Sequence, residues 1–474
     1  MSFPLEPSPE QVREMLELVT SKLVEFLHAN SRPANYSVDK AQSLASQRAD
    51  SLPTTTSTLD EILDELFSEV FPNALPTAHP GFMAYIPGGG IVHAGIADLI
   101  TKITNRYVGI DATAPLLSQI ETDVLKWFCE MVGYDNHSAG TLTSGGSIAN
   151  LTAVICARTK TMGDDFSNGV VYASNFVHHS MWKAFHAAGV NPRRIRAIDV
   201  DEQFRLDADK LALQMRQDIE QGLKPMMVVA TAGSTNTGTI DSLNEIADLC
   251  EAYSAWYHVD AAYGGFFCFT EYGRAKLAGI QRADSITLDP HKGLFLPYGT
   301  GAILVKNSED LKNTFSHQAD YIPEKASEQV LWDFSELSLE LTRPSRGLAI
   351  WLPFKMHGVQ AFRTTLQEKL DLAQYFCEQL RLDSRWKIVA TPELSLTVFK
   401  YSNSQLSKNE LNIINRQIIE SINSKGRVNL SGTSIAGEFV IRTCVLSFRT
   451  HQLQLDQLLE DLAEQLDLLA HTTK

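Results

Sequence analysis

Between residues 80 and 355, short continuous apolar runs alternate with stretches of helical periodicity such as 243–253. The runs predicted to be strands are 170–173, 194–198, 225–231, 256–259, 285–288 and 302–305. An apolar run without polar alternation is typical of a strand that is buried on both faces. Strands of this kind alternating with helices predict an α/β fold with a mostly parallel sheet.

The region before this one predicts helices. Apolar side chains recur at helical spacing in 9–30, where Ser8 is a plausible cap, and again in 58–70. The linker between them is rich in Ser, Thr and Pro. We expect residues 1–78 to form a helical N-terminal segment whose apolar faces need a partner, because the segment is too short to bury a core of its own.

The region after Trp351 changes character again. A long helix is predicted at 362–382, followed by helices at 407–424 and 452–469 and by strands at 386–389, 395–401, 428–430 and 439–446. This order predicts a small α+β domain. At 474 residues the chain exceeds what one core usually holds. We therefore expect three parts, 1–78, 79–355 and 356–474.

Lys292 stands just after one of the predicted strands, 285–288. The strand run stops at Pro290, and His291, Lys292 and Gly293 leave its carboxyl end, where an open α/β sheet binds its ligands. A lysine in this place can form a Schiff base with an aldehyde cofactor. A solvated loop lysine would show the same short pattern, so the interpretation depends on residues upstream.

Asp260 follows another predicted strand, within His258-Val-Asp-Ala-Ala-Tyr-Gly-Gly265. The small residues after it, Ala262 among them, would let a flat ring approach the backbone. A carboxylate can pair there with a protonated pyridine nitrogen and raise the pKa of that nitrogen. On its own, Asp260 could equally be an ordinary helix N-cap.

Gly145, Gly146 and Ser147 precede a predicted helix at 151–161. Glycines at a helix start expose backbone N–H groups to an anion, which is a common way to bind phosphate. The stretch matches neither a P-loop nor a dinucleotide fingerprint. A phosphate cradle, a carboxylate for a ring nitrogen and a lysine for an aldehyde together describe a pyridoxal 5′-phosphate (PLP) site, with PLP covalently attached to Lys292.

Five motifs carry a family resemblance: Ser144-Gly-Gly-Ser-Ile-Ala-Asn150, His178-His-Ser180, Ala230-Thr-Ala-Gly-Ser-Thr235, His258-Val-Asp-Ala-Ala-Tyr-Gly-Gly265 and Asp289-Pro-His-Lys292. With them the chain resembles the group II PLP-dependent amino-acid decarboxylases, from His79 to Arg449. That family includes aromatic-L-amino-acid, tyrosine, histidine, glutamate and diaminobutyrate decarboxylases. The resemblance implies the fold-type-I scaffold with a seven-stranded sheet, and a homodimer whose active site lies at the subunit interface.

The resemblance also implies roles for further residues. His178 would stack on the pyridine ring and hydrogen-bond the substrate or its carboxylate. The Thr235 hydroxyl would lie near the phenolic oxygen of the cofactor, and Ala262 and His291 would contact the cofactor. Asp289 occupies a position that is often Asn in the aromatic-substrate relatives. An aspartate would repel the phosphate dianion unless it bonds to a backbone N–H or to Lys292.

The implied reaction is decarboxylation of an L-amino acid to an amine and CO2, with Lys292, His178 and Asp260 as catalytic residues. Phe82 and Tyr85 match the substrate-facing segment of the family. The aromatic content of this segment favours an aromatic substrate, while the adjacent glycine run would also suit diaminobutyrate or another polar substrate, and glutamate stays open as well. The motifs argue against a transaminase, and residues 306–360 lack the loop cysteine that a desulfurase needs.

Phe334 raises the question of the product. The segment 316–342 resembles a mobile loop that in aromatic-amino-acid decarboxylases carries a tyrosine protonating Cα, and a gap-free match puts Phe334 in its place. A phenyl ring cannot donate a proton. Family members with Phe there include aldehyde synthases, so oxidative deamination to an aldehyde is an alternative. Otherwise Tyr321 or His291 protonates Cα, and Phe334 is a packing residue.

Composition narrows the class of partner. A formal net charge of −15 argues against nucleic acid or an anionic membrane surface. No apolar run reaches the roughly 18 residues of a membrane span, and the first residues lack the pattern of a signal peptide. The six cysteines are scattered without C-x-x-C spacing, which favours a reducing cytoplasm and argues against a metal site.

Overall fold

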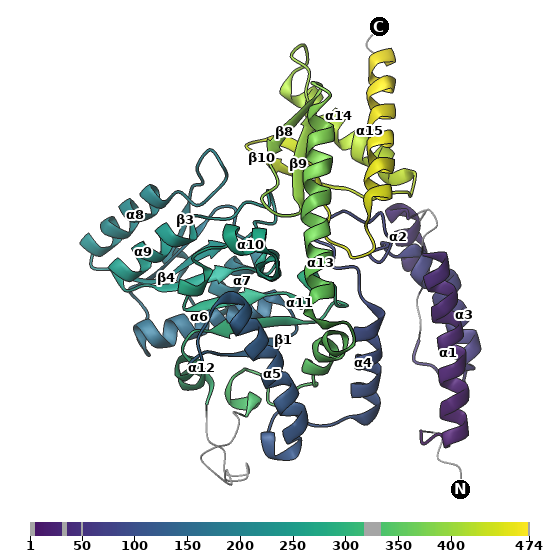
Figure 1. The fold of residues 1–474 in the computed structure, drawn as a ribbon, viewed down its shortest axis with the longest axis horizontal. Coiled ribbons are helices and arrows are strands. Elements are labelled where there is room, and N and C mark those ends of the chain that lie inside the picture. The colour runs from purple at the N-terminus through teal and green to yellow at the C-terminus, as the bar shows by residue number, and fades with distance from the viewer. Residues whose placement is uncertain (1–4, 31–35, 49–50, 317–332, 473–474) are drawn as a thin grey trace. The chain divides into compact units, whose positions relative to one another are not determined.

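The computed structural model describes residues 5–30, 36–48, 51–316 and 333–472 (Figure 1). The chain divides into two compact units. One unit consists of Met1–Ala84, Lys400–Ile441 and Arg449–Lys474, and the other of Tyr85–Phe399 and Arg442–Phe448. We call them the first and the second unit. The three-part division at residues 78 and 355 stays a prediction.

The second unit is built on a seven-stranded sheet of order β1-β7-β6-β5-β4-β2-β3. Its strands are β1 (Ala139–Thr143), β2 (Gly169–Ser174), β3 (Ile195–Ile198), β4 (Lys224–Thr231), β5 (Trp256–Asp260), β6 (Ser285–Leu288) and β7 (Gly301–Val305). The strands from β3 to β6 in this order pair in parallel, and β7 runs antiparallel to β1 and β6. The prediction of a mostly parallel sheet is confirmed.

The strand β1 is absent from the six runs that the sequence predicts. Its residues, Ala-Gly-Thr-Leu-Thr, include a single large apolar side chain, so no apolar run marks it. Pairing with β7 requires the small residue at Gly140, where a Cβ would lie 2.5 Å from the carbonyl oxygen of Ile303. Strand formation here depends on close packing against a neighbour rather than on local propensity.

Helices pack against the sheet of the second unit, α6 among them (Figure 1). The helices of this unit are α4 (Val92–Thr104), α5 (Pro115–Val132), α6 (Gly146–Met162), α7 (His179–Ala187), α8 (Ala208–Glu220), α9 (Leu243–Tyr253), α10 (Glu271–Lys276), α11 (Pro290–Gly293), α12 (Ser308–Phe315) and α13 (Gly347–Arg381). The helix predicted at 362–382 is the second part of α13. Gly358, at φ +70°, interrupts the helical backbone between the two parts of α13.

The first unit contains α1 (Pro9–Ala29), α2 (Val38–Gln47), α3 (Leu59–Glu65), α14 (Lys408–Ser424) and α15 (Gln452–Thr472). Ser8 caps α1 in a capping box with Gln11, as expected. The sequence predicts only a linker between the two N-terminal helices. This prediction is wrong, because the segment contains α2. Ser37 caps this helix by accepting from the N–H of Lys40, a signal that the Ser-rich composition of the linker conceals.

A four-stranded sheet has the order β10-β11-β9-β8, with β8 (Trp386–Ala390), β9 (Leu396–Tyr401), β10 (Ser431–Ile435) and β11 (Glu438–Cys444). The strand predicted at 428–430 is wrong. Asn429 forms only an isolated bridge with Phe82, and the strand follows at β10. Ala436 and Gly437, both at positive φ, make the tight turn that lets the polar residues of β10 pair with β11.

None of the helices in the described ranges is both long and apolar enough to cross a membrane.

Candidate active site

The residues predicted to bind a cofactor line one pocket of about 440 Å³ in the second unit. This volume lies within the range of small-molecule and cofactor sites. All ten are among its lining residues: Gly145, Gly146, Ser147, His178, Thr235, Asp260, Ala262, Asp289, His291 and Lys292. They come from segments up to 147 positions apart, counting from residue 145 to residue 292, and the sheet gathers them at the carboxyl ends of its parallel strands.

Lys292 enters the pocket from the short helix α11, directly after β6. Its Nζ lies 2.9 Å from Oδ2 of Asp289. Burial lowers the pKa of Lys292, but the two carboxylates of Asp289 and Asp260 outweigh burial, so the pKa is raised above its usual value. From the sequence, Asp289 is expected to bond to a backbone N–H or to Lys292, because it would otherwise repel the phosphate. The ion pair with Lys292 meets this requirement.

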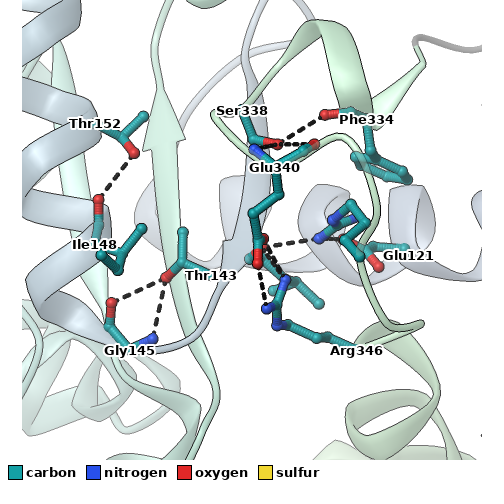
Figure 2. Close-up of polar contacts among 11 residues, drawn as sticks. Glu121, Thr143, Gly145, Ile148, Thr152, Phe334, Ser338, Glu340 and Arg346 are labelled. Atoms are coloured by element: carbon teal, nitrogen blue, oxygen red, sulfur yellow. Dashed lines mark hydrogen bonds and ion pairs between the residues drawn. The ribbon is translucent and has the colours of Figure 1, made fainter. Parts of the chain in front are cut away.

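The Gly-Gly-Ser turn lies between β1 and α6. Gly145 has φ +152° and caps α6, and its backbone N–H and C=O both bond to the hydroxyl of Thr143 (Figure 2). A Cβ on Gly146 would come 2.9 Å from Oδ2 of Asp289, so a side chain there would push that carboxylate away. The start of a 17-residue helix presents unpaired N–H groups, which favour a phosphate.

Asp260 ends β5 and is 5% exposed. Its Oδ1 accepts the backbone N–H of Ala262 at 3.1 Å, and its Oδ2 accepts the side-chain N–H of Asn150 at 3.0 Å. Both partners are neutral donors. A carboxylate has about four acceptor positions, so Asp260 can still accept from a cationic ring nitrogen in the pocket.

His178 is the N-cap of α7. Its Nδ1 accepts the backbone N–H of Ser180 at 3.3 Å and lies 2.8 Å from the hydroxyl oxygen of Ser180. Burial lowers the pKa of His178, which favours the neutral imidazole near pH 7. His178 is among the lining residues of the pocket, whereas the adjacent His179 is not.

The imidazole of His291 is hydrogen-bonded to a backbone carbonyl group. Its Nδ1 lies 2.6 Å from the carbonyl oxygen of Thr300, so Nδ1 carries the proton and donates it there. Burial lowers the pKa of His291, which leaves Nε2 without a proton near pH 7. This geometry argues against His291 as the donor to Cα.

The three residues predicted to be substrate residues, Phe82, Tyr85 and Phe334, are not among the lining residues of this pocket. Phe82, in the first unit, is 1% exposed and pairs with Asn429. Tyr85, in the second unit, is 61% exposed and adopts φ +56°. Their role in substrate binding stays a prediction.

Phe334 is buried in a polar cluster beside β1 (Figure 2). The Arg343 guanidinium lies 4.7 Å from its ring centroid, and Arg343 also donates to Glu121 and to the carbonyl oxygen of Leu142. The hydroxyl of Ser338 donates to the Phe334 carbonyl oxygen at 3.0 Å. This arrangement agrees with a packing role. Tyr321, the other candidate donor, lies outside the described residues.

Arg442 is a site residue that sequence reasoning missed. It is 4% exposed and donates to the carbonyl oxygens of Thr235 and Asn236, which fixes the turn that carries the Thr235 side chain. An arginine inside the apolar run Phe439-Val-Ile-Arg-Thr-Cys444 is the available signal, because a buried guanidinium needs acceptors.

The model of the pyridoxal-dependent decarboxylase conserved domain matches residues 42–402. The chain belongs to the pyridoxal-dependent decarboxylase family. Aromatic-L-amino-acid decarboxylase of Bacillus atrophaeus is 34% identical to it over 474 residues, which cover 99% of this chain and 98% of the relative. Tyrosine decarboxylase 3 of Petroselinum crispum is 29% identical, with 77% of this chain and 74% of the relative covered.

Solved structures agree with this family. The structure of Oryza sativa TDC with PLP and tryptamine has a TM-score of 0.93 and 25% identity, and the match covers 99% of this decarboxylase and 100% of that chain. A 4-hydroxyphenylacetaldehyde synthase of Rhodiola rosea shares the fold, with a TM-score of 0.90 at 23% identity and 97% and 98% covered. This decarboxylase is thus a carboxy-lyase that uses PLP and acts on an amino acid.

The residues of the pocket fit PLP. The side-chain-free position at Gly146 and the start of α6 suit its phosphate, the remaining acceptor positions of Asp260 suit its ring nitrogen, and the amine of Lys292 suits its aldehyde. In addition, Oδ1 of Asp289 is buried without a hydrogen-bond partner among the described residues, as expected for a polar atom that faces a bound group.

Proposed function

We propose that this protein decarboxylates an aromatic L-amino acid to the corresponding amine and CO2, with PLP held covalently by Lys292. The observation that carries the proposal is the convergence of Lys292, Asp260 and the Gly145–Ser147 turn on one pocket. When bound, PLP accepts the electron pair that is released when the bond between Cα and the carboxylate breaks.

The chain supplies position and charge to this reaction. Asp260 holds a proton on the ring nitrogen through a charge-assisted hydrogen bond, which keeps the ring electron-poor. The backbone N–H groups of Gly146 and Ser147 at the start of α6 would anchor the phosphate, and Thr235 would support the phenolic side of the ring. His178, with a proton on Nε2, contacts the ring face and donates to the carboxylate of the substrate.

The aromatic substrate class is supported by the relatives. The decarboxylase of Bacillus atrophaeus, matched along nearly its full length, is named for aromatic L-amino acids, and the plant relatives are named for tyrosine and tryptophan. Tyr263 and Tyr298 line the pocket, so their rings can pack on an aromatic side chain of a substrate. Diaminobutyrate and glutamate are the alternatives that the test must include.

Formation of an aldehyde is the second candidate product. The observation in its favour is the phenylalanine at position 334, which cannot return a proton to Cα. The contact of that ring with Arg343 favours packing instead, so amine is the product we expect.

We propose that the protein acts as a homodimer with the active site at the interface. In the second unit, one stripe of α4 exposes five apolar side chains while Ala94 and Ala97 on the same helix are buried. The exposed residues are Val92, Ile96, Leu99, Ile100 and Ile103. An apolar stripe of this kind on a surface helix is typical of a subunit interface. We also propose the cytoplasm as its compartment, because all six cysteines are unpaired and buried.

The test is product identification by mass spectrometry. The PLP-loaded protein is incubated in air with phenylalanine, tyrosine, tryptophan, DOPA, diaminobutyrate and glutamate in separate reactions. We expect an amine from an aromatic substrate, and an aldehyde with ammonia and peroxide would move the protein to the aldehyde synthases. Lys292→Ala should lose the product and the visible absorption of bound PLP. Lys160→Ala, which breaks a distant pair with Asp310, is the matched control and should change neither.

A further inference from the structure

Asn150 lines the pocket and connects Asp260 to Ser180, another lining residue, and to His258, which is not among the lining residues. Its side-chain nitrogen donates to Oδ2 of Asp260 at 3.0 Å and to the hydroxyl oxygen of Ser180 at 3.1 Å. Its side-chain oxygen lies 3.2 Å from Nε2 of His258. Asn150 is 1% exposed and His258 is fully buried, so solvent cannot replace these hydrogen bonds.

The direction of these hydrogen bonds follows from the chemistry of the groups. An ionised carboxylate only accepts, so the amide nitrogen of Asn150 must face Asp260, and the amide oxygen must face His258. That oxygen only accepts, so Nε2 of His258 carries a proton. The reverse orientation of the amide would place two acceptor oxygens together beside Asp260.

The same reasoning extends beyond His258. Burial lowers the pKa of His258, so the ring is neutral near pH 7 and its Nδ1 carries no proton. This Nδ1 lies 2.8 Å from the hydroxyl oxygen of Ser285, which must therefore donate to it. The indole Nε1–H of Trp256 can only donate, and it bonds to the same Ser285 oxygen at 2.8 Å. The chain of donors runs in one direction, from Trp256 through Ser285, His258 and Asn150 to Asp260. Parallel pairing of β5 with β6 sets His258 opposite Ser285.

A branch of this chain reaches His178. The second N–H of Asn150 donates to the Ser180 oxygen, so the Ser180 hydroxyl can give its proton to Nδ1 of His178, 2.8 Å away. The backbone N–H of Ser180 donates to the same atom. Neutral His178 must then carry its proton on Nε2, the nitrogen that is not engaged with Ser180.

We propose that Asn150, His258, Ser285 and Trp256 are positioning residues, whose one-directional hydrogen bonds hold the amide donor of Asn150 toward Asp260 and keep His178 in its Nε2-protonated form. This inference rests on the proposed function of Asp260 and His178. A chain of buried polar side chains costs free energy unless every partner is satisfied, and here each named donor, on α6, β5 and β6, finds an acceptor. The side-chain amide of Asn150 sets the direction of the hydrogen bonds both to Asp260 and, through Ser180, to His178.

The first experiment uses the protein without PLP, where no reaction takes place. Protein labelled with ¹⁵N-histidine is studied by NMR at neutral pH, and the signals are assigned by their loss in His258→Gln and His178→Gln. We expect both rings to be neutral and protonated on Nε2. A protonated Nδ1 on His258 would overturn the proposal, whatever the enzyme does with its substrate.

The second experiment compares two variants that each remove buried hydrogen bonds. Asn150→Leu keeps the approximate shape of the side chain but removes the donor to Asp260. Tyr257→Phe is the control, because Tyr257 is the neighbour of His258 on β5 and its hydroxyl donates only to the carbonyl oxygen of Leu243, away from the pocket. Both variants should unfold at a lower temperature than the parent protein.

Only Asn150→Leu should also lower kcat, by about 10- to 100-fold, the factor that corresponds to one hydrogen bond to a charged group. KM should change by less than kcat, and the visible absorption of bound PLP should depend on pH differently from the parent. Equal kcat in the folded fractions of the two variants would leave Asn150 a merely structural residue and overturn the proposal.

The two proposals fail separately. If the parent protein decarboxylates an amino acid while Asn150→Leu keeps its kcat, the positioning chain is wrong and the function stands. If the parent protein produces no amine or aldehyde while both histidines show the expected proton on Nε2, the chain of hydrogen bonds stands and the function is wrong.

Discussion

The ends of β5 and β6 present the same residue type in two different electrostatic settings. Asp260 ends β5, Asp289 follows β6, and the two strands are parallel neighbours. Both carboxylates are buried, at 5% and 2% exposed. Asp260 is bonded to neutral donors, whereas Asp289 is paired with the ammonium of Lys292 at 2.9 Å.

The difference teaches that the partner, and not the position in the sheet, decides what a buried carboxylate can do. Neutral donors stabilise the charge of Asp260 without cancelling it, so Asp260 can attract a cation that enters from outside. Asp289 has its charge matched by a lysine of the same turn. We expect its main effect to fall on Lys292 rather than on the cofactor ring.

The largest effect should come from removing the charge at the end of β5. Asp260→Asn keeps the shape but cannot hold a proton on a ring nitrogen, so kcat should fall by about 10²- to 10³-fold. The measurement is the rate of amine formation at saturating PLP. Full activity in this variant would mean that the ring nitrogen needs no carboxylate, and that the carboxylates at the ends of β5 and β6 do not differ in function.

The second prediction tests whether His258, which is linked to Asp260 through Asn150, stays neutral in the folded protein. Burial lowers the pKa of His258 to about 4, against an ordinary value of 6.5, while Asp260 and Ser285 act in the opposite direction. Between pH 6.5 and 4 the unfolded chain takes up a proton that the folded chain does not. The stability that this residue contributes is thus complete above pH 6.5 and is lost as the pH falls to 4.

The full loss corresponds to roughly 3 kcal/mol in the free energy of unfolding. Denaturant unfolding at several pH values checks it, with His258→Gln as the comparison, because this variant should lack that part of the pH dependence. A parent and a variant with parallel curves between pH 6.5 and 4 would show that His258 is not held neutral.

A smaller effect should follow from changing the end of β6. Asp289→Asn removes the charge that raises the pKa of Lys292, and burial then lowers it, so more of the amine is unprotonated at neutral pH. We expect the PLP-free protein to take up PLP faster by about 10-fold for each unit of pKa that is lost. The appearance of visible absorption after mixing measures this rate.

The control for this variant is Asp310→Asn. Asp310 pairs with Lys160 at 2.7 Å on other helices of the same unit, and its loss should leave the uptake of PLP unchanged. Equal or slower uptake in Asp289→Asn would show that the ion pair with Lys292 does not limit the reaction with the cofactor.

Much of the site could be predicted from the sequence because it lies where strands end. The apolar runs before Asp260 and Asp289 stop abruptly, so the strand end and its polar residue are visible together. β1 lacks such a run, and α2 is hidden in a Ser-rich segment, so local patterns could not reveal either element.

The hydrogen-bond partners of the site could not be predicted in the same way. Asn150 meets Asp260 across 110 positions of sequence, and Arg442 meets Thr235 across 207. Contacts at such separations depend on how the sheet pairs and on which strand returns to it, and a single sequence carries no direct signal of either. The glycine turn was predictable as an anion site, whereas its close contact with Asp289 was not.

The hydrogen bonds from Arg442 to the turn at Thr235 have a consequence for the order of events during synthesis. Residues Arg442–Phe448 belong to the second unit, although most of that unit ends at Phe399. A nascent chain that has already made the whole seven-stranded sheet still lacks the guanidinium that holds this turn. The pocket can therefore reach its final form only after Arg442 has left the ribosome, so a protein truncated before residue 442 should keep its sheet but bind PLP weakly.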